Sequence, residues 1–105
     1  NTVTIYKPLP KYPAITRDIA FVVEDSMQVG DIIDVIKGVG GKLLENVELF
    51  DVYRGQQIEE GKKSVAFALR YRDSQKTLTD EEVTKIHSKI LKALEERLGI
   101  LLREA

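Results

Sequence analysis

Asp51 and Tyr53 offer the clearest binding chemistry in the sequence, because they lie two residues apart in an alternating stretch from Leu43 to Arg54. Side chains at positions i and i+2 of a β-strand point to the same face of a sheet. A tyrosine ring can stack on a nucleobase, and a carboxylate accepts hydrogen bonds from N–H groups such as those on the Watson–Crick edge of guanine. The alternation changes phase near Leu49-Phe50, as at a β-bulge, and this places both residues outward.

Two other expected strands present small or polar side chains on the same outward face. Alternation assigns Ala20 and Val22 outward on one strand, and Ser64, Ala66 and Ala68 outward on another. Small side chains leave room for a flat group to lie against the sheet, and the serine hydroxyl can donate or accept a hydrogen bond. The candidate binding residues are Tyr53, Asp51, Ser64 and Ala20.

Each of these features also has an explanation that involves no RNA. An exposed tyrosine is a good strand former, an aspartate near a strand end is commonly solvated, and a row of small residues can be packed by a neighbouring domain. The chain has 16 basic and 17 acidic residues and a net charge of −1, which argues against sequence-blind nucleic-acid binding. Two interpretations fit eight of the basic residues, which would either contact phosphates or form a scattered solvated surface. They are Lys7, Lys11, Arg17, Lys62, Lys63, Arg70, Arg72 and Lys76.

The search for catalytic or metal chemistry finds no complete site. His87 is the only histidine, the chain has no cysteine, and the neighbouring Lys85 and Lys89 disfavour a bound cation. The acidic run Asp80-Glu81-Glu82 is explained by a helix N-terminus, where the dipole favours anions. We predict no catalytic residue, no metal ligand and no cofactor for this chain.

The elements that must position the candidate site follow from apolar periodicity and from turn residues. Gly40-Gly41 predicts the end of a first helix, and the capping-box pattern Thr79-Asp-Glu-Glu82 predicts the start of a second. The expected elements are strands at Arg17–Asp25, Leu43–Arg54, Lys62–Arg72 and Ile100–Arg103, with helices over Val29–Val39 and from Thr79 to Gly99.

This order predicts an α+β fold of the ferredoxin-like, split βαββαβ kind, with a four-stranded antiparallel sheet and two helices on one face. Right-handed crossovers bring both helices to the same side and leave the other side open. We expect residues 1–15 to be an extended, proline-rich leader from a preceding domain, and residues 16–105 to form the domain itself. The composition, 43% hydrophobic and 31% charged, is typical of a soluble globular domain without a membrane span.

Five strings in the sequence resemble one known family. They are Tyr6-Lys-Pro-Leu-Pro-Lys-Tyr-Pro13, Arg17-Asp18, Leu49-Phe-Asp-Val-Tyr-Arg-Gly55, Gly61-Lys-Lys-Ser-Val-Ala66 and Thr77-Leu-Thr-Asp-Glu-Glu-Val83. In this order they look like the ferredoxin-fold anticodon-binding domain that ends the β subunit of bacterial phenylalanyl-tRNA synthetases. The resemblance covers nearly the whole chain, from Tyr6 to Arg103.

The resemblance implies a non-catalytic domain that binds the anticodon stem-loop of the tRNA specific for phenylalanine. Aminoacylation would take place on the α subunit with ATP and Mg²⁺, in a cytoplasmic heterotetrameric ligase, whereas the isolated domain would be a monomer. The family's base-contacting positions fall on Tyr53 as stacking platform, with Ala20, Asp51 and Ser64 on the same surface.

Two other functions fit the same fold. A ferredoxin-like regulatory module would dimerise and bind an amino acid at the seam, and would favour a glycine-rich turn where this chain has Glu24-Asp-Ser-Met-Gln28. A pure interaction domain would pack its open face on another protein.

Overall fold

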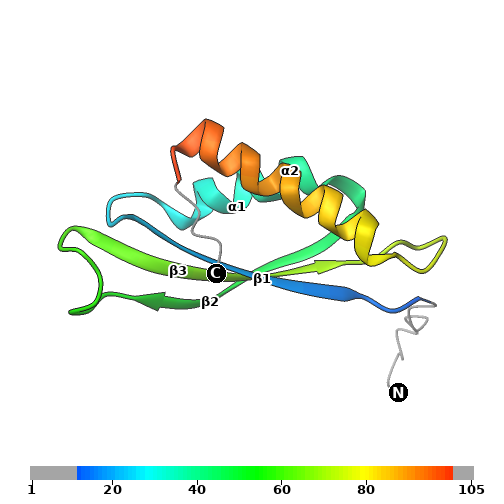
Figure 1. Ribbon diagram of the computed structural model, residues 1–105, viewed down its shortest axis with the longest axis horizontal. Helices are drawn as coiled ribbons and strands as arrows, with labels where there is room; N and C mark the ends of the chain where they lie inside the picture. Colours follow the sequence, from blue (N-terminus) through cyan, green and yellow to red (C-terminus); the bar gives the residue numbers. More distant parts are fainter. Residues whose placement is uncertain (1–11, 101–105) are drawn as a thin grey trace, which may run out of the picture.

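The computed structural model describes residues 12–100 as a three-stranded sheet covered by two α-helices. Both helices lie on the same side of the sheet, as Figure 1 shows, so the α+β class and the helix-free face agree with the prediction. The elements in chain order are β1 (Ile15–Glu24), α1 (Val29–Gly40), a 3-10 turn (Gly41–Leu43), β2 (Leu44–Tyr53), β3 (Lys62–Tyr71) and α2 (Asp80–Leu98).

The strands are antiparallel and run in the order β1-β3-β2, so β3 is central. The prediction of four strands is met only in part, because the sheet formed by residues 12–100 has three. The fourth was expected at Ile100–Arg103, where Ile100 is buried without strand structure and the rest lies outside the described residues. Most of the predicted leader, residues 1–15, also lies outside them, and β1 begins at Ile15.

The core lies between the sheet and the helices. Phe21 of β1 and Phe67 of β3 stack with ring centroids 5.9 Å apart, and side chains from both helices cover them. Along β3, fully buried apolar side chains alternate with small or polar side chains, so one face of the strand packs against the helices and the other forms the open face. The largest of them are Tyr71, Phe67, Ile32, Ile36, Leu69, Ile90, Leu94, Val65 and Val83.

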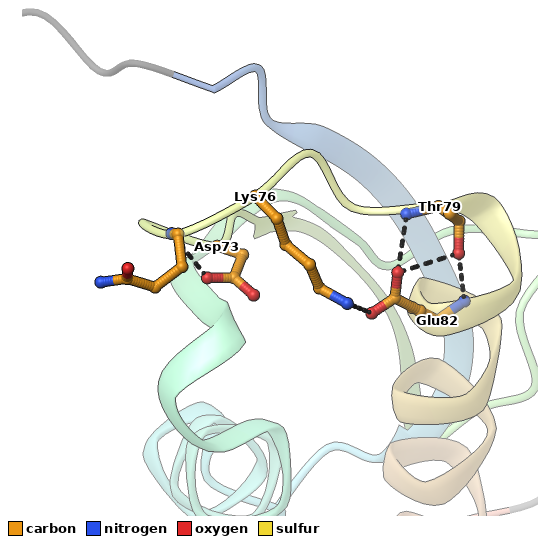
Figure 2. A network of polar contacts seen from close by, with 5 residues as sticks. Asp73, Lys76, Thr79 and Glu82 are labelled. Carbon is orange, nitrogen blue, oxygen red and sulfur yellow. Dashed lines mark hydrogen bonds and ion pairs between the residues drawn. The ribbon is translucent and has the colours of Figure 1, made fainter.

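The ends of the helices follow the sequence signals. Gly41 follows α1 with φ of 63°, a backbone region that strongly favours glycine. At the start of α2, the Thr79 side chain accepts a hydrogen bond from the Glu82 N–H at 3.2 Å, and the Glu82 carboxylate accepts one from the Thr79 N–H at 3.3 Å. Figure 2 shows this capping box with Lys76, whose Nζ lies 2.7 Å from the Glu82 carboxylate. The predicted capping box is therefore confirmed.

Strand β2 contains two irregularities in its pairing with β3. Leu49 pairs with Phe67 and Asp51 pairs with Ala66, so Phe50 is an extra residue and is 55% exposed. This confirms the bulge predicted at Leu49-Phe50. A second shift, between Leu44 and Asn46, was not predicted.

Candidate nucleic-acid interface

The bulge at Phe50 puts the candidate site on the open face. Before the bulge, Leu49 lies opposite the buried Phe67 and Val47 lies opposite the buried Leu69, so both face the helices. Without the bulge, Phe50 would lie opposite Ala66 and Asp51 would continue that series toward the core, because facing alternates along a strand. With it, Asp51 and Tyr53 pair with outward positions of β3 instead.

The four predicted site residues lie together on the face that carries no helix. The pairing registers place them in two adjacent rows across all three strands, and directly opposed Cβ atoms in such rows are about 4.5–5.5 Å apart. One row is Val22, Ser64 and Tyr53, and the next is Ala20, Ala66 and Asp51.

The first row carries the Tyr53 ring, and the second carries the Asp51 carboxylate, a hydrogen-bond acceptor. Tyr53 is 45% exposed and Val22 is 41% exposed, whereas Ala66 in the floor of the second row is buried. Within residues 12–100, neither the Asp51 carboxylate nor the hydroxyls of Tyr53 and Ser64 form a hydrogen bond or ion pair. Their polar atoms are therefore available to a ligand.

Asp25 ties the three strands together beside the first row. Its N–H donates to the Gly61 carbonyl at 2.8 Å, and its carboxylate accepts from Nε of Arg54 at 2.7 Å. The Asp25 carbonyl accepts from Nζ of Lys63, a lysine only 7% exposed. These bonds hold the end of β1 against the ends of β2 and β3, and so fix the strands that carry the Tyr53 row.

The open face becomes acidic beyond the two rows. Asp18 of β1 and Glu48 of β2 both lie opposite Ala68 of β3, and both are exposed. Two carboxylates one row beyond Asp51 repel phosphate groups.

Among the described residues, the basic side chains considered for phosphate contacts are spread over both faces of the sheet or lie near carboxylates. Arg17 faces the helices, where its Nη2 donates to the Thr84 hydroxyl at 3.2 Å, and Lys63 is buried. Arg72 donates to both carboxylate oxygens of Glu45 at 3.0 and 2.8 Å. Three of the remaining candidates also lie near carboxylates, and two lie outside the described residues. The three are Lys62, Arg70 and Lys76, and the two are Lys7 and Lys11.

The His87 side chain projects from α2 toward the sheet and makes a structural contact there. Its Nδ1 is 3.1 Å from the hydroxyl of the fully buried Tyr71. Burial lowers the pKa of His87, and the nearby Arg17 charge acts in the same direction. Burial raises the pKa of Tyr71 to about 12, so the phenol stays protonated at neutral pH, and the tautomer of the imidazole decides which of the two groups donates.

Over residues 12–100, no three His, Cys, Asp or Glu side chains are grouped so that they could hold a metal ion. In the same part of the chain, neither helix is long and apolar enough to cross a membrane.

Comparison with known proteins identifies relatives along nearly the whole chain. Residues 10–103 match the ferredoxin-fold anticodon binding domain family. The chain is 56% identical over 98 residues to the phenylalanine-tRNA ligase beta subunit of Bacillus licheniformis, and 51% identical over 103 residues to that of Halalkalibacterium halodurans. These alignments cover 93% and 98% of this chain, but only 12% and 13% of the relatives. The chain therefore spans about an eighth of their length.

Proposed function

The chain belongs to the family of ferredoxin-fold anticodon-binding domains, and from this we propose that it binds the anticodon stem-loop of the tRNA specific for phenylalanine. It would do so as a non-catalytic domain of a phenylalanine-tRNA ligase β subunit. The observation that carries the proposal is the meeting of Tyr53, Asp51 and Ser64 in two adjacent rows of a helix-free face.

In the proposed complex, an unpaired guanine, the first anticodon base, stacks on the Tyr53 ring. Stacking on an aromatic side chain is typically worth about 1–3 kcal/mol per base and tolerates every base. Discrimination therefore falls to Asp51, whose carboxylate has no partner within residues 12–100 and can accept from the N–H groups of the guanine edge. Ala20 and Ala66 leave space above the sheet for the base, and the Ser64 hydroxyl adds one donor or acceptor.

The parent enzyme would be a cytoplasmic heterotetramer in which the α subunit carries out aminoacylation with ATP and Mg²⁺. We assign both cofactors to the α subunit and neither to this domain. The isolated domain would be a monomer, which a measurement of mass in solution tests.

Titration of the 105-residue chain with the cognate anticodon stem-loop tests the proposal. Tyr53→Ala should weaken binding by about 1–3 kcal/mol through the lost stack. Tyr53→Phe is the matched control, because it keeps the ring and removes only the hydroxyl, and should bind nearly as well as the natural chain. Unchanged affinity for Tyr53→Ala would reject the site. It would leave the regulatory and protein-interaction functions as the alternatives.

A further inference from the structure

Gly55 lies directly beneath the Tyr53 side chain. A Cβ atom built on Gly55 would be 2.5 Å from Cζ of Tyr53 and 3.0 Å from its Cε2, and it would meet the phenol oxygen more closely still. Real Cβ atoms essentially never lie within 3.0 Å of a non-bonded heavy atom. The far end of the ring therefore occupies the space that a side chain at residue 55 would need.

The backbone of Gly55 does not itself require glycine. Within the described residues, the glycines with positive φ are Gly41, Gly61 and Gly99, and Gly55 is not among them. Gly55 is also exposed, and the three heavy atoms nearest to its added Cβ all belong to Tyr53. The obstacle to a side chain at this position is therefore the tyrosine ring.

We infer that Gly55 is a positioning residue for the Tyr53 ring: by lacking a side chain, it lets the ring lean along the chain over the start of the β2–β3 loop. An added methyl group would force rotation about the Tyr53 side-chain torsions, because the atoms that it meets are the far end of that side chain. The stacking surface would then move relative to Asp51 and Ser64, which are fixed on the sheet by strand pairing. This inference rests on the proposed function for its effect on RNA, but not for the contact between ring and glycine.

The test compares Gly55→Ala with Gly30→Ala in the 105-residue chain. Gly30 is the matched control because it is also exposed, and an added Cβ there meets nothing within 4 Å. The first readout needs no RNA: the NMR shifts of the Gly55 protons in the free chain should be displaced by the ring current, and Tyr53→Leu should remove that displacement. The second readout is stem-loop affinity in a cycle of Gly55→Ala, Tyr53→Ala and the double variant.

We expect Gly55→Ala to weaken binding by about threefold to tenfold, less than the full loss of a stack. Gly30→Ala should leave the affinity unchanged. In the Tyr53→Ala background, Gly55→Ala should have no further effect, because the ring that it displaces is gone. An equal loss in both backgrounds, or Gly55 shifts that ignore Tyr53, would overturn the inference while Tyr53→Ala still reports on the site. A ring-dependent Gly55 shift without any effect of Tyr53→Ala on affinity would instead reject the RNA site, and with it the role of Gly55 in binding.

Discussion

The hydrogen bond between Tyr71 and His87 should contribute measurably to the free energy of unfolding. Tyr71→Phe removes one hydroxyl from a side chain that is fully buried, and leaves the shape of the core unchanged. The bond length is 3.1 Å, and the lost bond is worth about 0.5–1.5 kcal/mol, as is typical of a neutral pair. Because His87 is only half-buried, water can partly replace the removed hydroxyl, and we expect the free energy of unfolding to fall by about 1 kcal/mol. For a domain of this size, that lowers the Tm by about 4 °C.

Urea and thermal unfolding of four chains measure this contribution: the natural sequence, Tyr71→Phe, His87→Ala and the double variant. The coupling energy of the cycle should be about 1 kcal/mol, because each single change breaks the same bond. If the two changes add to within about 0.3 kcal/mol, the tyrosine and the histidine act independently and the reasoning fails.

The same cycle has a pH dependence whose sign follows from the lowered pKa of His87. Above the unfolded pKa of about 6.5, both states are neutral and the stability is fully present. As the pH falls toward the folded pKa, the unfolded chain binds a proton that the folded chain does not, and stability is lost by at most about 1.4 kcal/mol per pH unit. His87→Ala should therefore be less acid-sensitive than the natural chain between pH 7 and pH 5. An identical acid dependence would contradict the assignment.

Three further results are expected. Asp51→Asn should reduce the preference for guanine over adenine at the first anticodon base by about tenfold, measured with paired stem-loops, because one carboxylate acceptor becomes a donor; an unchanged ratio would remove Asp51 from base reading. The log–log dependence of affinity on salt should be shallow, with a slope of about −2 or less in magnitude, because the candidate basic residues Lys62, Arg70, Arg72 and Lys76 each lie near a carboxylate; a slope steeper than about −4 would indicate many phosphate contacts. Thr79→Ala should lower the unfolding free energy by about 1 kcal/mol through the lost cap, and Thr79→Ser should restore most of it; equal stability of all three chains would show that the cap contributes nothing.

Local patterns in the sequence predicted the parts of the fold that depend on local chemistry. Alternation placed Ala20 and Ser64 on the open face, because facing along a regular strand depends only on position. The Thr79 capping box was predictable because all its atoms come from four consecutive residues. The bulge at Phe50 was predictable because the apolar positions change phase there. The roles of the four site residues stay predictions.

Contacts between distant segments could not be read from the sequence. Lys63 and Arg72 belonged to a possible phosphate rim, yet their partners, the Asp25 carbonyl and Glu45, are 38 and 27 positions away. Pairing of this kind depends on how the strands come together and leaves no local pattern. The acidic row of Asp18 and Glu48 could have been found by applying the alternation separately on each side of the bulge, once the strand order was known.

Strand β2 is in effect two half-strands of opposite facing joined at Phe50, because two residues of β2 there take the place of one. A substitution at Phe50 preserves the count of residues and hence the direction in which its successors point. Removing Phe50 would place Asp51 directly after Leu49, where regular alternation keeps Asp51 opposite Ala66 and outward, whereas adding a residue without a second bulge would turn Asp51 and Tyr53 inward. Relatives that retain this surface should therefore tolerate changes of residue type at the bulge, or loss of the extra residue, far better than an insertion there.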